Sequence, residues 1–317
     1  MKLHHLSPLF PFIHPISTLS LNRPSLTLSP QIVAQFPNPT PILYTVQNPA
    51  SSAPQVRLLH DFSAEENHVE GLTGITETSH DVFVFVGGSM TTHTFYAWGV
   101  NFTSTARNPS ADGNPIIKKI AGLKDVKLPN GLATLPGSPS SVLIADSVGG
   151  LTWRLDIQTG KSTPARGFKV GINGIKVQEG YLYFSNSNSR STYKVRIRQD
   201  GTRDLGANVR LVGRLPEEVS FLDDFVVGRG ERRTTIFATT SCDNRLWALA
   251  QGKRPVVVAG SQGQLTLAGS TEAAFGRGNR DRDVLYVVTS GGVGKPVNGS
   301  VTEGGKIVKV DLSAFQM

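Results

Sequence analysis

The stretch that decides the fold is Gly171-Ile172-Asn173-Gly174-Ile175-Lys176-Val177-Gln178-Glu179-Gly180-Tyr181-Leu182-Tyr183-Phe184-Ser185-Asn186-Ser187. Two short segments of apolar and aromatic residues flank a Glu-Gly pair, which is typical of a β-hairpin with a tight turn. A similar layout recurs at 128–147, where Asn130 precedes a strand, and at 221–240, where Asp223 and Asp224 do. The sequence therefore predicts a repeating strand pair that opens on a polar residue.

This repeat extends along most of the chain. Groups of three or four predicted strands begin near Val69, Asn130, Ile172, Asp223 and Ala273. Their starts lie about 45 to 60 residues apart, which is the spacing of β-propeller blades, and no long helical pattern separates them. The sequence therefore predicts an all-β fold, a six-bladed β-propeller whose first blade is incomplete.

The N-terminal part of the repeat is depleted. Segments 42–46 and 56–60 fit two outer strands of a first blade, and no inner strand is evident there. Propellers usually close by pairing strands from both termini in one blade, because this removes an open sheet edge. We therefore expect 307–312 to pair with this first unit, and a single propeller domain to span 39–317.

Residues 1–38 are rich in Pro, Ser and Leu and show no sustained helical or strand period. The start of this segment resembles a secretion signal, but prolines interrupt its apolar part and no clear cleavage site follows. The segment 1–38 is expected to be either a disordered leader or a degraded signal peptide. Secreted and cytoplasmic locations both remain open.

Composition narrows the class of protein. The 317 residues are 38% hydrophobic, enough for a full core, and carry a formal net charge of +8. The basic residues are scattered, so they indicate a solvated surface and no nucleic-acid track. The one cysteine, Cys242, excludes an internal disulfide framework. No apolar run reaches about 18 residues, so no membrane span is expected.

Several segments act together as a signature. They are LAGSTEAAFGR at 267–277, VLYVVTSGG at 284–292 and PVNGSVTEGGK at 296–306, together with 171–186 and 256–261. As a set they resemble the SMP-30/gluconolactonase-like six-bladed propellers, and more closely a fungal branch of that family. The resemblance covers roughly residues 40–317 and implies a small-molecule substrate as the partner.

One activity that the resemblance implies is metal-dependent lactone or ester hydrolysis. Lactonases of this family hold a divalent cation at the mouth of the central channel, and the matching positions here offer Asn173 and Asp223 as ligands, with Asn130 nearby. Such oxygen ligands suit Ca²⁺, Mg²⁺ or Mn²⁺, and Zn²⁺ less well. The family's metal-binding Glu from the first blade has no counterpart, and Glu70 opens the next blade instead. One carboxylate with two neutral amides makes a weak cage for a cation.

The fungal branch also contains hetero-Diels–Alderases, which join a quinone methide derived from a tropolone or phenol to a humulene-type terpene. For this chemistry the resemblance implies no required cofactor and a largely apolar substrate. Asn130, Asn173 and Glu70 would then contact the substrate, and Asp223 or Asp224 would act as acid or base. Because the first-blade Glu is missing, this is the preferred function. Aromatic residues available for an apolar pocket are Tyr96, Trp98, Trp153, Phe184 and Phe225.

Each candidate residue has a structural alternative. Asn130 and Asn173 precede glycines and could be turn residues. Asp223 and Asp224 could form hydrogen bonds at a strand end, and Glu70 could be an exposed structural residue. The aromatic residues alternate along strands, as blade packing requires. A non-catalytic binding propeller is therefore a third hypothesis, beside the cyclase and the lactonase.

Overall fold

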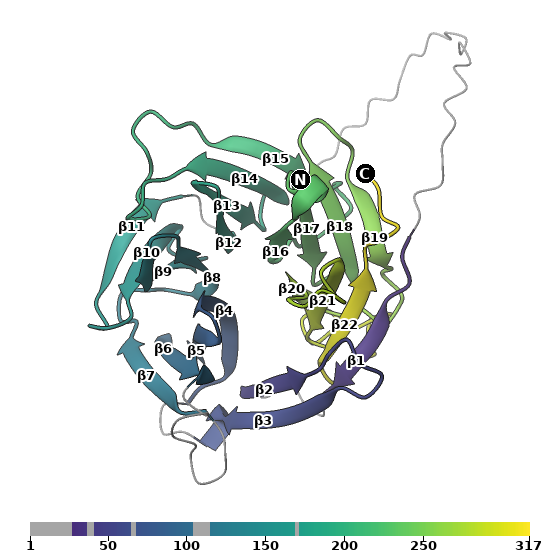
Figure 1. Ribbon diagram of the computed structural model, residues 1–317, viewed down its shortest axis with the longest axis horizontal. Helices are drawn as coiled ribbons and strands as arrows, with labels where there is room; N and C mark the ends of the chain where they lie inside the picture. The colour runs from purple at the N-terminus through teal and green to yellow at the C-terminus, as the bar shows by residue number, and fades with distance from the viewer. Residues whose placement is uncertain (1–26, 37–40, 65–67, 104–114, 169–170) are drawn as a thin grey trace, which may run out of the picture.

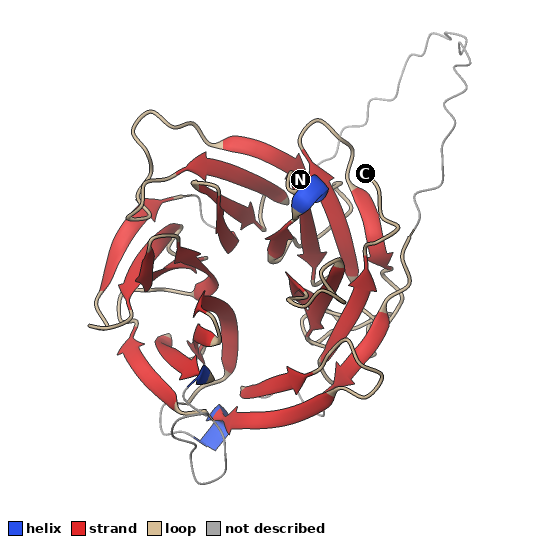
Figure 2. Ribbon diagram, viewed as in Figure 1, coloured by secondary structure: helices blue, strands red, loops and turns tan. Residues whose placement is uncertain are grey.

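Five four-stranded antiparallel sheets lie around a common axis in the computed structural model of this protein (Figure 1). The structure describes residues 27–36, 41–64, 68–103, 115–168 and 171–317. Strands dominate these residues, and the helices among them are short 3₁₀ turns such as Phe62–Ala64 and Gly230–Arg232 (Figure 2). The predicted all-β propeller is confirmed, but it has five blades and not six; a two-stranded sheet stands where the incomplete first blade was expected.

In four of the blades the strands follow one another along the chain, and the first strand of each lies nearest the axis (Figure 1). The first blade contains β4 (Gly71–Ser79), β5 (Val82–Ser89), β6 (Thr94–Asn101) and β7 (Ile117–Gly122). The second contains β8 (Pro129–Leu135), β9 (Ser138–Asp146), β10 (Leu151–Asp156) and β11 (Ser162–Gly167). The third contains β12 (Ile172–Gln178), β13 (Tyr181–Asn186), β14 (Ser191–Arg196) and β15 (Arg210–Arg214). The fourth contains β16 (Phe225–Val227), β17 (Thr235–Thr240), β18 (Arg245–Ala250) and β19 (Val256–Gly260).

The fifth blade joins the two ends of the described chain. It is formed by β20 (Ser270–Phe275), β21 (Val284–Thr289) and β22 (Lys306–Asp311), with β1 (Gln31–Gln35) as its outer strand. The pairing of strands from both ends in one blade is confirmed, but the expected partner is wrong: β22 pairs with β1 and β21. Segment 31–35 lies within the expected leader 1–38, so the propeller begins before residue 39. Residues 1–26 lie outside the described residues.

The depleted unit forms a two-stranded sheet of β2 (Ile42–Gln47) and β3 (Gln55–Asp61). It lies on the outside of the ring, between the fifth blade and the first (Figure 1). Both strands match the segments predicted for an incomplete blade. No inner strand accompanies them among the residues that the structure describes.

The hairpin that predicted the fold has the expected turn. β12 and β13 are joined by Glu179 and Gly180, whose φ angles are 52° and 75°. Two consecutive positive φ angles are typical of a type I′ turn, whose twist matches that of antiparallel strands. Tyr181 and Gln178 pair directly beside this turn, which sets the register of the blade.

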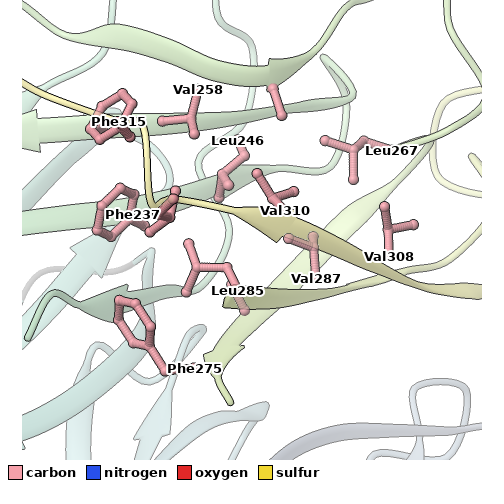
Figure 3. Close-up of a cluster of buried hydrophobic side chains, with 14 residues drawn as sticks. Phe237, Leu246, Val258, Leu267, Phe275, Leu285, Val287, Val308, Val310 and Phe315 are labelled. Atoms are coloured by element: carbon pink, nitrogen blue, oxygen red, sulfur yellow. The ribbon is translucent and has the colours of Figure 1, made fainter. Parts of the chain in front are cut away.

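The hydrophobic core lies between neighbouring blades. In the largest cluster, Phe237 and Leu246 of the fourth blade pack with Phe275, Leu285 and residues of β22 from the fifth (Figure 3). Four further clusters occupy other positions around the ring. Burying each such side chain stabilises the fold by about 1.5–3 kcal/mol, so inter-blade packing holds the ring together.

Glycines let the inner strands approach one another closely. A Cβ atom on Gly74 would lie 2.1 Å from the Asn130 carbonyl oxygen, and one on Gly131 would lie 2.7 Å from the Gly174 Cα. A Cβ on Gly174 would lie 2.0 Å from a carboxylate oxygen of Asp224. These contacts bring β4, β8, β12 and β16 together at the axis, and they place the polar residues that open these strands near one another.

Candidate functional site

The Asp223–Asp224 pair opens β16 and is fixed on both sides by its neighbours. The Asp223 N–H donates to the Thr239 carbonyl at 2.9 Å, and the Thr239 N–H donates to the Asp224 carbonyl at 3.0 Å. The Ser185 hydroxyl of β13 donates to the Asp223 carbonyl at 2.8 Å. The two carboxylates are therefore held by a backbone that cannot readily shift.

A partly buried ion-pair network forms beside this pair. The Lys176 ammonium donates to a carboxylate oxygen of Asp224 at 3.0 Å and to one of Glu272 at 3.0 Å. Lys176 lies on β12 of the third blade and Glu272 on β20 of the fifth, so their contact joins two blades that the fourth separates (Figure 1). The side chains of Lys176, Asp224 and Glu272 are 22%, 9% and 27% exposed. We call Asn173, Lys176, Asp223, Asp224 and Glu272 the axial site.

The two aspartates of the axial site have different pKa values. Burial and the charge of Asp224 raise the pKa of Asp223 to about 7. Burial also raises the pKa of Asp224, to about 6, and there the charge of Lys176 opposes this effect. Burial alone would lower the pKa of Lys176, but Asp224 and Glu272 outweigh it and raise that pKa. Lys176 therefore stays charged, while Asp223 can hold a proton near neutral pH.

The two predicted asparagines lie on neighbouring inner strands, and Asn173 is the one that contacts Asp223. Asn173 is 3% exposed and donates from its side-chain amide to the Ser187 hydroxyl at 3.1 Å. Its amide oxygen is buried without a hydrogen-bond partner in the described part of the structure. The Asn173 and Ser241 side chains both lower the pKa of Asp223 by hydrogen bonding. Asn130 is half-buried on the neighbouring inner strand β8.

Glu70 does not take part in the axial site. Its carboxylate accepts hydrogen bonds from the Ser89 hydroxyl at 2.9 Å and from the N–H groups of Met90 and Thr91 at 2.8 and 3.2 Å. These bonds lower the pKa of Glu70 and stabilise the turn between β5 and β6. The exposed Glu70 thus has the local structural contacts of a turn residue.

The aromatic candidates lie in the cores between blades. Four of them, Trp98, Trp153, Phe184 and Phe225, are buried in four different clusters, and Tyr96 packs against one of these. They therefore pack blades together, as the structural alternative predicted.

The donor groups of the axial site fit a divalent cation poorly. Asp223 and the unpaired oxygen of Asn173 are available, but Asp224 and Glu272 are both hydrogen-bonded to Lys176, whose positive charge repels a cation. Glu70 is engaged in its turn. Nowhere in the described residues do three or more His, Cys, Asp or Glu side chains gather as a metal would require. Of the three carboxylates this leaves Asp223 without a cationic partner, and one such carboxylate with neutral amides does not form the oxygen cage that Ca²⁺ or Mg²⁺ prefers.

Comparison with known proteins gives the chemistry a context. The chain is similar to two fungal proteins named provisionally as hetero-Diels-Alderases. The protein from Sarocladium schorii (asR5) is 29% identical over 287 residues, which cover 77% of this chain and 69% of the relative. That from a Phoma species is 28% identical over 285 residues, which cover 77% and 76%. No family model matches the chain.

Solved structures support the fold alone. A luciferin-regenerating enzyme aligns with a TM-score of 0.56 and 15% identity, covering 90% of this chain and 92% of that one. Regucalcin from Agrobacterium tumefaciens, a calcium-binding protein, also aligns with a TM-score of 0.56, at 12% identity over 90% and 95% of the two chains. The resemblance to SMP-30-like propellers is thus confirmed at the level of fold.

Two residues of the axial site, Lys176 and Glu272, were not predicted from the sequence. Lys176 was a detectable signal, because it is a charged residue within an otherwise apolar inner strand, Ile175-Lys176-Val177. Glu272 stands in β20 within a segment singled out only for its resemblance. Their proximity depends on the positions of three blades, which no local pattern encodes.

Proposed function

We propose that the chain is an enzyme of fungal specialised metabolism of the non-redox type, most concretely a hetero-Diels–Alderase or related cyclase. The observation that carries this proposal is the similarity, over 77% of the chain, to two fungal proteins of that name. The axial site supports it, because Asp223 is an acid whose pKa of about 7 suits proton transfer at neutral pH.

The proposed substrates are a benzylic alcohol beside a ring hydroxyl and a humulene-type terpene. Protonated Asp223 gives its proton to the benzylic hydroxyl, the C–O bond breaks, and water leaves. The ring hydroxyl then loses its proton to the Asp223 carboxylate, which restores the acid and leaves a neutral quinone methide. This diene adds to the terpene alkene by forming one C–C and one C–O bond, and the addition needs no further proton or electron.

Neighbouring groups support this role of Asp223. In this proposal Asn173 and Asn130 orient the oxygenated ring by hydrogen bonds, and orientation of two bound partners is itself a large part of such catalysis. Lys176 holds Asp224 as a carboxylate beside Asp223, and this negative charge helps keep the proton on Asp223. In this proposal the reaction requires no cofactor.

The two-stranded sheet bears on the choice of function. We infer that β2 and β3 are the remnant of a sixth blade, because both lie at outer positions of the ring (Figure 1). An inner strand of that blade would carry the Glu that the family's lactonases use to bind metal. Without it, the axial site keeps its acid and its amides but has too few anionic ligands for a tightly held cation.

A metal-dependent lactonase or esterase is the second candidate. One observation favours it: the buried oxygen of Asn173 has no partner among the described residues and lies beside Asp223. Asn173 and Asp223 would be the ligands of the cation. The charge of Lys176 and the engagement of Glu70 count against this candidate.

The test is an assay of the purified full chain with an ortho-hydroxybenzyl alcohol and humulene, followed by mass spectrometry. We expect loss of water and formation of the cycloadduct, unaffected by EDTA, and a decrease of about 100-fold in the dehydration rate for Asp223→Asn. Asp61→Asn, a change at an exposed carboxylate of β3, is the matched control and should leave the rate unchanged. Hydrolysis of sugar lactones that EDTA abolishes and Ca²⁺ restores would instead establish the lactonase.

A further inference from the structure

A cavity lies away from the axial site, between the two-stranded sheet and the fifth blade. Its volume is about 740 Å³, and it is lined by the turn after β2 and by the β20–β21 turn. No residue of the axial site lines it. A volume of this size is typical of sites for small organic ligands.

The walls of this cavity combine apolar surfaces with two arginines. Val46, Pro49 and Ala50 lie on the side of the two-stranded sheet, and the Phe275 and Tyr286 side chains lie on the other. The arginines, Arg277 and Arg280, come from the β20–β21 turn. Such a lining suits a molecule with a flat apolar body and a negative end.

The two arginines differ in their contacts. Arg277 donates to a carboxylate oxygen of Asp81 at 3.0 Å and also pairs with Glu77, so its charge is balanced. Arg280 is exposed, and no carboxylate contacts it in the part of the chain that the structure describes. Arg280 is therefore the available positive group of the cavity.

The acidic residue of the cavity is already engaged. Asp281 is 8% exposed and accepts hydrogen bonds from the Gly278 N–H at 2.7 Å and from the Tyr286 hydroxyl at 3.0 Å. Burial and this bond to Asp281 raise the pKa of Tyr286 to about 12, so Tyr286 remains a neutral donor. Asp281 thus holds the turn in shape and leaves Arg280 accessible to a ligand.

We propose that this cavity binds a small aromatic carboxylate, with its carboxylate on Arg280 and its ring between the Val46–Ala50 wall and Tyr286. A guanidinium donates two parallel N–H hydrogen bonds to the two oxygens of a carboxylate, a bidentate geometry that an ammonium cannot provide. The apolar walls select a ring, because they would gain nothing from a small inorganic anion. The site is independent of the axial site and of the reaction proposed for it.

The probe for this site is 4-fluorobenzoate, whose binding to the full chain is followed by ¹⁹F NMR. A single exposed ion pair with a buried ring predicts a dissociation constant on the order of 1 mM. We expect Arg280→Gln to weaken binding about 10-fold. Arg282→Gln is the matched control. Arg282 is an exposed arginine two residues further along the chain, and it does not line the cavity.

The neutral analogue 4-fluorobenzamide tests the need for charge. The proposal is upheld if Arg280→Gln weakens binding at least about 5-fold more than Arg282→Gln and the amide binds more weakly than the acid. It is overturned if the two variants lose affinity equally, if the amide binds as well as the acid, or if no binding occurs near 10 mM, roughly ten times the expected constant. Cyclase activity of the axial site should be unchanged in Arg280→Gln, so failure of either proposal leaves the other testable.

Discussion

Replacing Asp223 by Asn should stabilise the protein at pH 8 while removing its acid. The pKa of Asp223 is raised to about 7 in the folded protein, from an ordinary value of 3.8. A group whose pKa is raised by folding contributes stability that is fully present below the unfolded pKa and is lost as the pH rises through the folded pKa. Between about pH 4 and pH 7 Asp223 is ionised in the unfolded chain but still protonated in the folded protein, so the free energy of unfolding should fall as the pH rises.

The size of this effect follows from the difference between the two pKa values. Each unit corresponds to about 1.36 kcal/mol, so an interval from 3.8 to about 7 corresponds to roughly 4 kcal/mol at most. A side-chain amide at this position also loses contact with water, which offsets part of the gain. We expect Asp223→Asn to raise the free energy of unfolding by about 2 kcal/mol at pH 8 and by close to zero at about pH 3.5.

Urea unfolding of the wild type and the variant at several pH values measures this difference. Asp61→Asn provides the control, because hydrogen bonds from Ser63 lower the pKa of Asp61 and its removal should give no gain at pH 8. A variant that is less stable than the wild type at pH 8, or a difference that is the same at low and high pH, would refute the reasoning. A gain in stability with a loss of dehydration activity would identify Asp223 as a residue kept for function.

Three further changes test other parts of the structure. Lys176→Met should lower the free energy of unfolding by about 3 kcal/mol at pH 7, because it leaves Asp224 and Glu272 without their buried partner; calorimetry measures the loss, and a neutral result would contradict the ion-pair network. Gly174→Ala should lower both stability and activity, since its Cβ would lie 2.0 Å from a carboxylate oxygen of Asp224, whereas the same change at the exposed Gly294, where a Cβ would contact nothing, tests for a general glycine effect. Arg277→Gln should lower the free energy of unfolding by about 1 kcal/mol in low salt and by less in high salt, because the ion pairs of Arg277 are half-exposed and salt screens them. Urea unfolding at the two salt concentrations measures this, and an equal loss at both would contradict the prediction.

The features that the sequence predicts are those with a local pattern. The hairpin around Glu179-Gly180 and the polar residues that open the inner strands were predictable, because turn chemistry and strand alternation act over a few residues. The proximity of Asn173 to Asp223 follows from the blade repeat. The pairing of β1 with β22 joins segments about 270 residues apart and leaves no such pattern, so the start of the propeller was placed too late.

The aromatic residues show a different limit of sequence reasoning. Side chains on alternate faces of a blade strand all meet a neighbouring blade, so an aromatic residue on either face is buried. Alternation thus predicts burial for Trp98 and Phe225 but cannot distinguish a pocket from a core. The contact of Lys176 with Glu272 required the angles between three blades, which only the structure provides.

The contacts between neighbouring inner strands change in kind at the axial site, and this change helps to define the role of Lys176. From β4 to β16 the inner strands meet through glycines, whereas β16 and β20 are joined by hydrogen bonds: the Asp224 N–H donates to the Thr271 carbonyl at 3.2 Å, and the Thr239 hydroxyl lies 2.8 Å from the carbonyl oxygens of both Asp224 and Thr271, to one of which it can donate. Lys176 therefore both ties β20 to β12 and sets the charge beside Asp223. If Lys176 only tied the strands together, Lys176→Arg would keep both the stability and the activity that Lys176→Met loses. If the position of the positive charge also controls the pKa of Asp223, Lys176→Arg should keep the stability but shift the pH profile of dehydration, because a guanidinium cannot occupy the position of the ammonium.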